Sequence, residues 1–279
     1  MKWISKTLAL AAIGALVGNA SAWNSVGHRV IATIAVENLL PSVSAEASRL
    51  LAAAPNGAST DFVTVSTWAD ETRTRENGPW HYIDYYFRSD GQPATHKPDE
   101  ENVVWAIAKF SQVLADKTKP DAERAEALRF LIHFVGDVHQ PLHATSRESA
   151  DRPDGDRGGN SFQILAPAGL TDMPRPPRNL HSFWDLGGGL FQNENPAAIH
   201  DQAEALMRKY PRRSLKTVGD PKPNDWALES FAIDKQFVYT TPEHQAPDSV
   251  YVMKTQQISG ERATLAGYRL ADLLNRLLK

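Results

Sequence analysis

The sequence predicts a mainly α-helical protein: a single-domain helical bundle with one small β-hairpin and long loops. Apolar residues recur three and four positions apart along most of the chain, which is the period of a helix that buries one face. The alternation of apolar and polar residues that marks a half-buried strand is sparse. Residues 23–279 together approach the upper size of one hydrophobic core, which favours a single domain.

Residues 1–22 are predicted to form a signal peptide that is cleaved on export. Lys2 and Lys6 supply a positively charged start, an apolar run follows, and Ala20-Ser21-Ala22 fits a small-residue cleavage site. The apolar run is short for a membrane span and contains glycine, so a membrane anchor is the weaker interpretation. The mature chain would begin at Trp23 and reside in the periplasm or outside the cell.

The composition limits which bonds can stabilise the chain, which residues can bind zinc and how nucleic acid could be held. The chain has no cysteine, so disulfides cannot stabilise it, and zinc ligands would have to be His, Asp, Glu or backbone groups. The formal net charge of −3 at pH 7 argues against a non-catalytic protein that holds nucleic acid by a broad basic surface. A metal-dependent nuclease remains possible, because bound cations would supply positive charge where a phosphate binds.

Helices are expected where the helical period persists along the chain. In chain order the expected segments are residues 30–40, 103–114, 125–134, 203–207 and 252–278. Pro120 and Asp121 favour the first turn of the helix that carries His133. Pro141 should end or bend this helix, which would let His143 turn back toward it.

One arm of the small hairpin is expected at residues 161–165, directly after the turn-forming sequence Gly158-Gly159-Asn160. Surface loops are expected on both sides of this arm. Residues 151–159 are rich in Asp, Arg and Gly, and residues 166–178 are rich in proline.

Two His–Asp pairs with helical spacing are the strongest chemical signal in the chain. His133 precedes Asp137 by four residues, and His181 precedes Asp185 by the same interval. On a helix this spacing puts the imidazole and the carboxylate on one face, about a turn apart. Zinc accepts nitrogen and oxygen ligands, so the two pairs predict a site for several metal ions inside a helical bundle.

The other histidines and acidic residues divide by their surroundings. His96, His200 and His244 lie in polar stretches and are expected at the surface, whereas His139 is expected to pack or to support the ligands. With the α-amine of Trp23, the remaining set offers enough donors for three four- or five-coordinate ions. These candidate ligands are His28, His81, His133, His143, His181, Asp70, Asp137 and Asp185.

Several of these sequence elements carry a resemblance to a known family. They are Trp23-Asn-Ser-Val-Gly-His28, Thr67-Trp-Ala-Asp70 with Arg73, Trp80-His81-Tyr-Ile-Asp84, His133-Phe-Val-Gly-Asp137-Val-His-Gln-Pro-Leu-His143, Gly158-Gly159-Asn160 and His181-Ser-Phe-Trp-Asp185. The chain resembles, in order and spacing from Trp23 to Asp185, the zinc-dependent single-strand-specific nucleases of the S-one/P-one type. The resemblance implies a helical bundle of the phospholipase C and single-strand nuclease type. The lack of cysteine and the export signal fit a bacterial member.

The resemblance assigns each candidate ligand to one of three zinc ions. Trp23 would bind through its new α-amine and its carbonyl oxygen, and Asp137 would bridge the first two ions. In the order of the ions, the implied ligand sets are Trp23 with His28; Asp70, His81 and His133; and His143, His181 and Asp185.

The resemblance also implies how a substrate is held. Arg73 would contact the phosphate and, with Asp70 and Asp137, make up the catalytic group. Tyr82 would stack on a base and Asp84 would accept hydrogen bonds from its edge. Asn160 would contact the substrate at the same place. Fungal members carry Phe at the position of Tyr82, a change that stacking should survive, and the family's disulfides are absent here.

Together these residues predict an endonuclease with 3′-nucleotidase activity that hydrolyses single-stranded DNA and RNA to 5′-phosphate and 3′-hydroxyl products. A bridged metal pair makes water nucleophilic near neutral pH. Tyr82 and Asp84 need an unstacked base, which a duplex does not present. The expected partners are single-stranded nucleic acid and 3′-nucleotides; no membrane or protein partner is implied, and a monomer is the default.

Two alternatives stay open at this point. A zinc-dependent phospholipase C would share the fold and the N-terminal Trp ligand, although Asp185 stands where those lipases typically place Glu. The pair Tyr82 and Asp84 also fits a base better than a lipid. A periplasmic zinc-binding protein without turnover is the second alternative, and Arg73 beside the metals argues against it.

Overall fold

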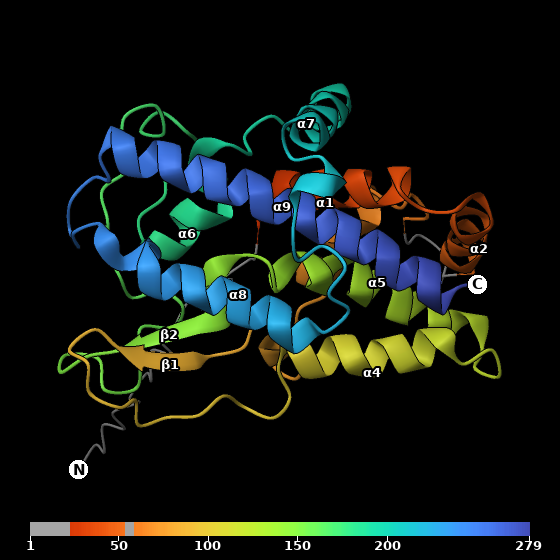
Figure 1. Cartoon of the computed structure of the whole chain (residues 1–279), viewed down its shortest axis with the longest axis horizontal. Coiled ribbons are helices and arrows are strands. Elements are labelled where there is room, and N and C mark those ends of the chain that lie inside the picture. Colours follow the sequence, from red (N-terminus) through yellow and green to blue (C-terminus); the bar gives the residue numbers. More distant parts are fainter. Residues whose placement is uncertain (1–22, 54–58) are drawn as a thin grey trace, which may run out of the picture.

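The computed structural model describes residues 23–53 and 59–279, and this part of the chain is mainly helical, as predicted (Figure 1). The predicted signal peptide lies outside the described residues. A two-stranded sheet accompanies the helices. The α-helices of the described part are α1 (Ser25–Glu37), α2 (Pro41–Ala52), α3 (Trp68–Glu71), α4 (Val103–Ala115), α5 (Asp121–Asp137), α6 (Leu180–Asp185), α7 (Pro196–Lys209), α8 (Pro223–Gln236) and α9 (Ser249–Leu277).

The helices expected from apolar periodicity are all present. α5 begins at Asp121 directly after Pro120, as the two residues predicted, and it ends at Asp137 before Pro141. α1 begins earlier than its apolar residues indicated, because the side chain of Asn24 caps it and accepts a hydrogen bond from Gly27 N at 2.9 Å. Neither α2 nor α8 was expected.

The bundle is built around α5 and α9. α5 is buried on all sides over residues 127–137, and α1, α2, α4 and α9 pack against it. α9 has 29 residues and crosses α1 closely at Gly267, where a Cβ atom would lie 2.5 Å from Cγ2 of Ile34. Among the described helices, none is both long and apolar enough to cross a bilayer.

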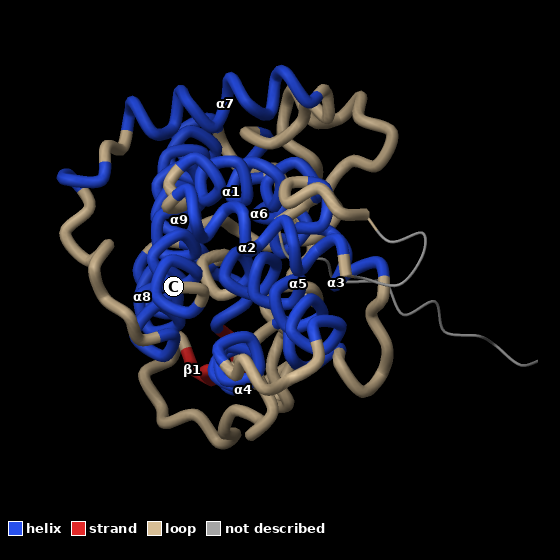
Figure 2. The backbone as a smooth tube through the Cα atoms, turned by 90° about the vertical axis from the view of Figure 1, so that its right-hand side faces the viewer, coloured by secondary structure: helices blue, strands red, loops and turns tan. Residues whose placement is uncertain are grey.

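The small sheet is not a hairpin, so this part of the prediction is wrong. β1 (Tyr85–Arg88) pairs in parallel with β2 (Thr145–Glu148), with Tyr85 opposite Thr145. A parallel pair needs a long crossover, which α4 and α5 supply here. Figures 1 and 2 both put the sheet at an edge of the helical bundle.

The expected hairpin arm at residues 161–165 forms only an isolated antiparallel bridge, from Gln163 to Asn179. Gly158 and Gly159, which precede this arm, take left-handed backbone angles, with φ of 61° and 75°. The resulting turn directs the chain toward the segment that begins α6 rather than into a second strand.

Candidate metal centre and substrate pocket

The eight predicted side-chain ligands converge on the buried C-terminal end of α5, although they come from six segments. α5 carries His133 and Asp137. The rest lie on α1 (His28), on α3 (Asp70), at the end of the 3₁₀ turn Gly78–His81, on the 3₁₀ turn Pro141–Ala144 (His143) and on α6 (His181, Asp185). All are buried except Asp70, whose side chain is 18% exposed.

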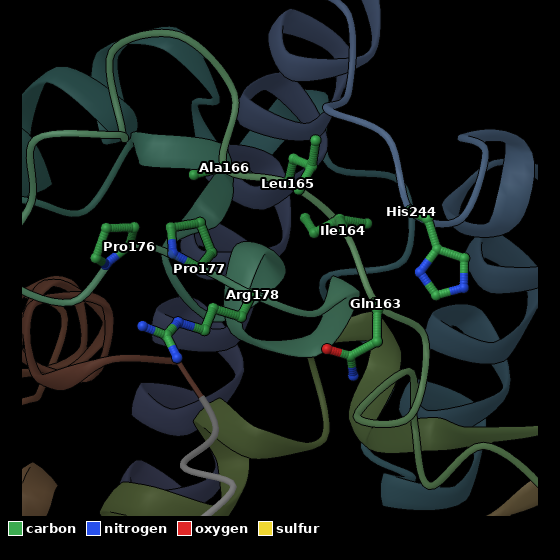
Figure 3. Close-up of a pocket in the computed structure, with 8 residues that line it drawn as sticks. All are labelled: Gln163, Ile164, Leu165, Ala166, Pro176, Pro177, Arg178 and His244. Atoms are coloured by element: carbon green, nitrogen blue, oxygen red, sulfur yellow. The ribbon is translucent and has the colours of Figure 1, made fainter.

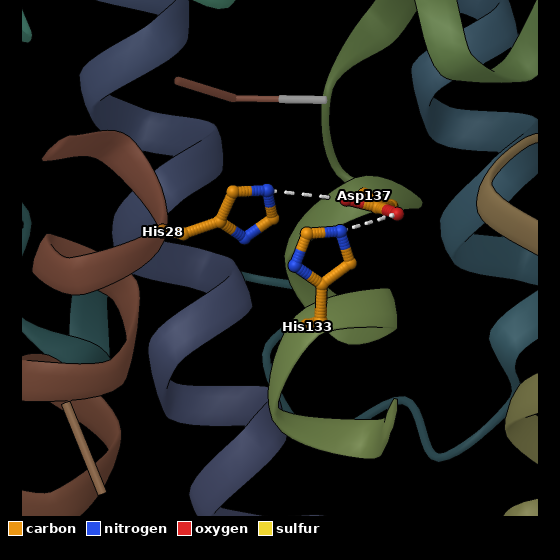
Figure 4. Close-up of side chains that lie close together, drawn as sticks. All are labelled: His28, His133 and Asp137. Carbon is orange, nitrogen blue, oxygen red and sulfur yellow. Dashed lines mark ion pairs between the residues drawn. The ribbon is translucent and has the colours of Figure 1, made fainter. Parts of the chain in front are cut away.

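Asp137 lies between three histidines. Its Oδ1 is 3.3 Å from Nε2 of His28, and its Oδ2 is 3.0 Å from Nδ1 of His81 and 3.2 Å from Nε2 of His133. Figure 4 shows His28 and His133 pointing toward this carboxylate from α1 and α5. Because its two oxygens face different histidines, Asp137 can bridge two ions.

Two further groups have the spacing of metal ligands. Asp70 Oδ1 lies 3.6 Å from both His81 Nδ1 and His133 Nε2. On the other side of the site, His181 Nε2 lies 3.6 Å from Asp185 Oδ1. Three groups could therefore each hold a metal ion: His28 with His133 and Asp137; Asp70 with His81 and His133; and His143 with His181 and Asp185.

Backbone carbonyl groups orient three of the imidazoles. In each, Nδ1 lies 2.7–2.8 Å from a carbonyl oxygen: His133 with Ser66, His143 with His81, and His181 with Gly158. An Nδ1–H that donates to a carbonyl leaves the lone pair on Nε2, which faces the centre. Metal-binding histidines are usually held in this way.

The third group tests whether zinc fits. His143 Nε2 and His181 Nε2 face each other at 3.1 Å, and in neutral rings whose Nδ1–H groups donate to the two carbonyls, each Nε2 presents a lone pair. Two nitrogens on one tetrahedral zinc, each about 2.05 Å away, are about 3.3 Å apart. The distance between the two nitrogens is therefore close to that of two ligands on one zinc ion.

Burial and charge put several of these groups in the protonation state that binds metal. Burial lowers the pKa of His81 to about 4 and that of His143 to about 3, so both imidazoles are neutral at pH 7. Asp70 is ionised as well: burial opposes its ionisation, but the positive charge that His133 carries in the metal-free site outweighs burial and lowers the pKa of Asp70 to about 2. A metal ion bound at this group would take the place of the proton on Nε2 of His133.

Asp185 shows the opposite behaviour. Burial raises the pKa of its carboxyl group well above the usual range. Its ionised form therefore needs a positive charge close by, which a metal ion at the third group would supply.

Trp23 lies at the same site. Its indole Nε1 donates to the carbonyl of Gly136 at 3.0 Å, and the next residue, Asn24, donates its backbone N–H to the carbonyl of Asp185 at 3.0 Å. The indole of Trp23 thus lies beside the residue that precedes Asp137, and the backbone that follows Trp23 lies beside that of Asp185. Its predicted α-amine would arise by cleavage before Trp23, at residues outside the described part of the chain.

A cavity of about 480 Å³ opens beside the third metal group. His143 and His181 line it, so one wall of the cavity consists of candidate ligands. All predicted substrate-binding residues line it as well: Arg73, Tyr82, Asp84 and Asn160. Its volume is in the range of small-molecule sites.

The substrate-binding candidates are held by local contacts. Arg73 donates from Nη2 to the carbonyl of Gly78 at 3.1 Å, and Asn160 donates from Nδ2 to the carbonyl of Arg157 at 2.8 Å. Burial raises the pKa of Asp84 to about 7, and the negative charges of Asp156 and Asp99 add to this effect.

Gln140 was not predicted to belong to the site. Its Nε2 donates to Asp185 Oδ1 at 2.7 Å, and its Oε1 accepts from Leu142 N at 2.7 Å. It therefore ties the turn that carries His143 to a ligand of the third group. Gln140 lies within the run from His133 to His143 that carries the family resemblance, and this position was the only sign in the sequence that it belongs to the site. Arg75 and Arg157, which also line the cavity, were likewise missed.

The remaining histidines lie where they were expected. The side chains of His96, His200 and His244 are 42%, 55% and 74% exposed. His139 is buried behind the site, where its Nε2 accepts from Arg269 Nη1 at 2.9 Å. A separate surface pocket, between Gln163, Pro176 and His244, shares no residue with the three metal groups (Figure 3).

Comparison with known proteins gives concordant matches. A family model described as S1/P1 Nuclease matches residues 23–279. Endonuclease 4 of Arabidopsis thaliana is 28% identical over 99% of this chain and 95% of its own length. Nuclease P1 of Penicillium citrinum is 31% identical over 58% of this chain and 57% of that protein. Nuclease S1 of Aspergillus oryzae is 27% identical over 91% of each.

Proposed function

This chain belongs to the S1/P1 nuclease family, and from that premise we propose that it is a zinc-dependent, single-strand-specific endonuclease with 3′-nucleotidase activity. Its substrates would be single-stranded DNA, RNA and 3′-nucleotides, and its products 5′-phosphates and 3′-hydroxyls. Residues 23–279 would form the single catalytic domain after removal of residues 1–22. The mature protein would act as a monomer in the periplasm or outside the cell.

One observation supports this proposal above the others. A wall of the cavity that contains Tyr82 and Asp84 is made by His143 and His181, which face each other with the spacing of zinc ligands. A phosphodiester that enters with its base against Tyr82 would therefore reach the metal groups. A store of zinc without turnover would not need such a cavity.

Three zinc ions would be held by the residues that converge on α5. The proposed ligand sets are Trp23 with His28; Asp70, His81 and His133; and His143, His181 and Asp185, with Asp137 shared by the first two. Zinc in such a site acts as a Lewis acid that activates water and offsets phosphate charge.

The protein's own side chains would position the substrate. Arg73 can donate two hydrogen bonds to phosphate oxygens and so offset the charge that develops on them. Tyr82 presents a ring for stacking, and Asp84 presents a carboxylate to the edge of the base. Both contacts require a base that is free of its partner strand, which explains selection for single strands.

The decisive experiment measures zinc per chain and hydrolysis on protein that begins at Trp23. We expect three ions per chain, cleavage of single-stranded oligonucleotides well ahead of duplexes, and no cleavage of lecithin. Asp137→Asn should lose zinc and turnover, whereas Asp201→Asn on the exposed face of α7 should keep both. One ion or fewer, or turnover that survives exhaustive chelation, would overturn the proposal.

A further inference from the structure

Arg157 and Arg75 are two arginines of the substrate cavity to which the proposed function gives no role. Arg157 and Arg75 both line the cavity that holds Tyr82 and Asp84, and both are exposed at its rim. The charge of Arg157 acts on both Tyr82 and Asp84. Two guanidinium groups at the rim of one cavity are notable in a chain with a formal net charge of −3.

The backbone of Arg157 is held in an unfavourable conformation. Its φ is +58°, a left-handed angle that residues other than glycine adopt at a cost. Its N–H donates to Ser146 Oγ at 3.1 Å, and its carbonyl accepts from Asn160 Nδ2 at 2.8 Å. Both backbone polar groups are therefore satisfied, and they determine where the side chain leaves the loop.

The same loop is tied to the metal centre. The carbonyl of Gly158, the next residue, lies 2.7 Å from Nδ1 of His181. A Cβ atom at Gly158 would lie 2.3 Å from the carbonyl oxygen of Leu142, so the loop packs directly on the turn that carries His143. Arg157 is thus held next to the third metal group.

A polynucleotide carries more phosphates than this cavity can take. The cavity, about 480 Å³ in volume, is of the size that takes one small ligand. The neighbouring phosphates of a longer strand must therefore lie at its mouth. An arginine there matches a phosphate in charge and in the geometry of its paired N–H donors.

We propose that Arg157, assisted by Arg75, binds the phosphates that flank the scissile phosphate, so that oligonucleotides are cleaved in preference to 3′-mononucleotides. This inference rests on the proposed nuclease function and adds a strand-binding subsite to it. It commits these two residues to phosphate rather than to the base, which Tyr82 and Asp84 would hold.

The test compares kcat/KM on a single-stranded tetranucleotide with kcat/KM on a 3′-mononucleotide. Arg157→Gln should lower the ratio of the two about tenfold, as expected for one charged hydrogen-bonded contact. Arg75→Gln should lower it less. Arg208→Gln on α7 removes the same charge from an exposed site and should leave the ratio unchanged.

A second variant guards against misfolding. Arg157→Gly removes the guanidinium and also relieves the left-handed strain. This variant should melt no lower than the wild type, and its ratio of kcat/KM on the tetranucleotide to kcat/KM on the mononucleotide should fall about tenfold, as for Arg157→Gln. The slope of log KM for the oligonucleotide against log salt should also fall by about 0.7 for each lost phosphate contact.

A methylphosphonate at the flanking position identifies the contact directly, because it removes the charge of one phosphate. It should lower wild-type kcat/KM about as much as Arg157→Gln does, and the two changes together should have little further effect. An equal loss on the mononucleotide, or independent effects of the two changes, would overturn this inference. A wild type that cleaves neither substrate would instead overturn the proposed function.

Discussion

Gly136 gives a test of how closely the fold holds His28 beside Asp137. It lies on α5 directly before Asp137, and the atoms nearest to the place that a Cβ would take belong to the ring of His28 and the side chain of Ile31. Replacing Gly136 with alanine would add one methyl group at this contact. We expect the metal-free protein to stay folded while the metal groups that include His28 bind zinc more weakly.

The size of the effect follows from the distances. A Cβ atom at Gly136 would lie 3.0 Å from Nδ1 and 3.1 Å from Cε1 of His28. Comfortable contacts need about 3.5 Å or more, so the ring must move by about 0.5 Å. Metal–ligand distances tolerate only about 0.2 Å. We therefore expect a loss of about tenfold in zinc affinity, in the range seen when the residues around a ligand are disturbed.

The stability of the metal-free protein should change in the opposite sense or not at all. Alanine is favoured over glycine within a helix by up to about 1 kcal/mol, which offsets the crowding at His28. Thermal melting in the presence of a chelator measures the stability of the metal-free protein, and competition with a chromogenic chelator measures zinc affinity. Gly260→Ala is the control, because its Cβ would meet the ends of leucine side chains and a tyrosine ring, away from the metal groups.

Two results would refute this reasoning. If Gly136→Ala binds the full complement of zinc as tightly as the wild type, the ring of His28 can accommodate the added methyl group without leaving its ligand position. If the variant loses its fold in chelator, the glycine serves packing rather than ligand position.

Three further predictions concern other parts of the molecule. Because burial raises the pKa of Asp84 to about 7, its carboxylate is lost below that pH, and KM for 3′-nucleotides should rise about tenfold from pH 8 to pH 6; a flat profile would remove Asp84 from base binding. Burial also raises the pKa of Asp234 well above its usual range, so its contribution to stability is present at low pH and lost as pH rises. Asp234→Asn should therefore raise the melting temperature more at pH 8 than at pH 4, and equal shifts would contradict this. Gly267→Ala would place a Cβ 2.5 Å from the side chain of Ile34 and should lower the free energy of unfolding by about 1–3 kcal/mol; calorimetry that shows no loss would mean that α1 and α9 can separate freely.

Local pattern was enough to predict most of the helices and not enough to predict the sheet. α4 and α9 bury apolar stripes that the sequence displays openly. α8 was missed because its buried face includes Ser230 and Asp234, which do not register as apolar. The parallel pairing of β1 with β2 depends on the crossover through α4 and α5, which no short window of sequence reveals.

The candidate ligands could be predicted because their chemistry and spacing are visible in the chain, and the structure brings eight of them into three groups. The groups that hold these ligands by hydrogen bonds could not be predicted. Gln140 reaches Asp185 only after α5 and α6 have packed, and the carbonyl of Ser66 reaches His133 across 67 positions of sequence. Such partners are set by tertiary contact rather than by residue type.

Because main-chain carbonyl oxygens orient the imidazoles, the residues that supply these carbonyls should tolerate changes of side chain. A carbonyl group is present whatever side chain the residue carries, so exchanging Ser66 for another small residue should leave the tautomer of His133 intact. Substitutions at such a position should leave zinc binding unchanged as long as the backbone keeps its path. The opposite holds at Gly158, where the path itself admits no side chain.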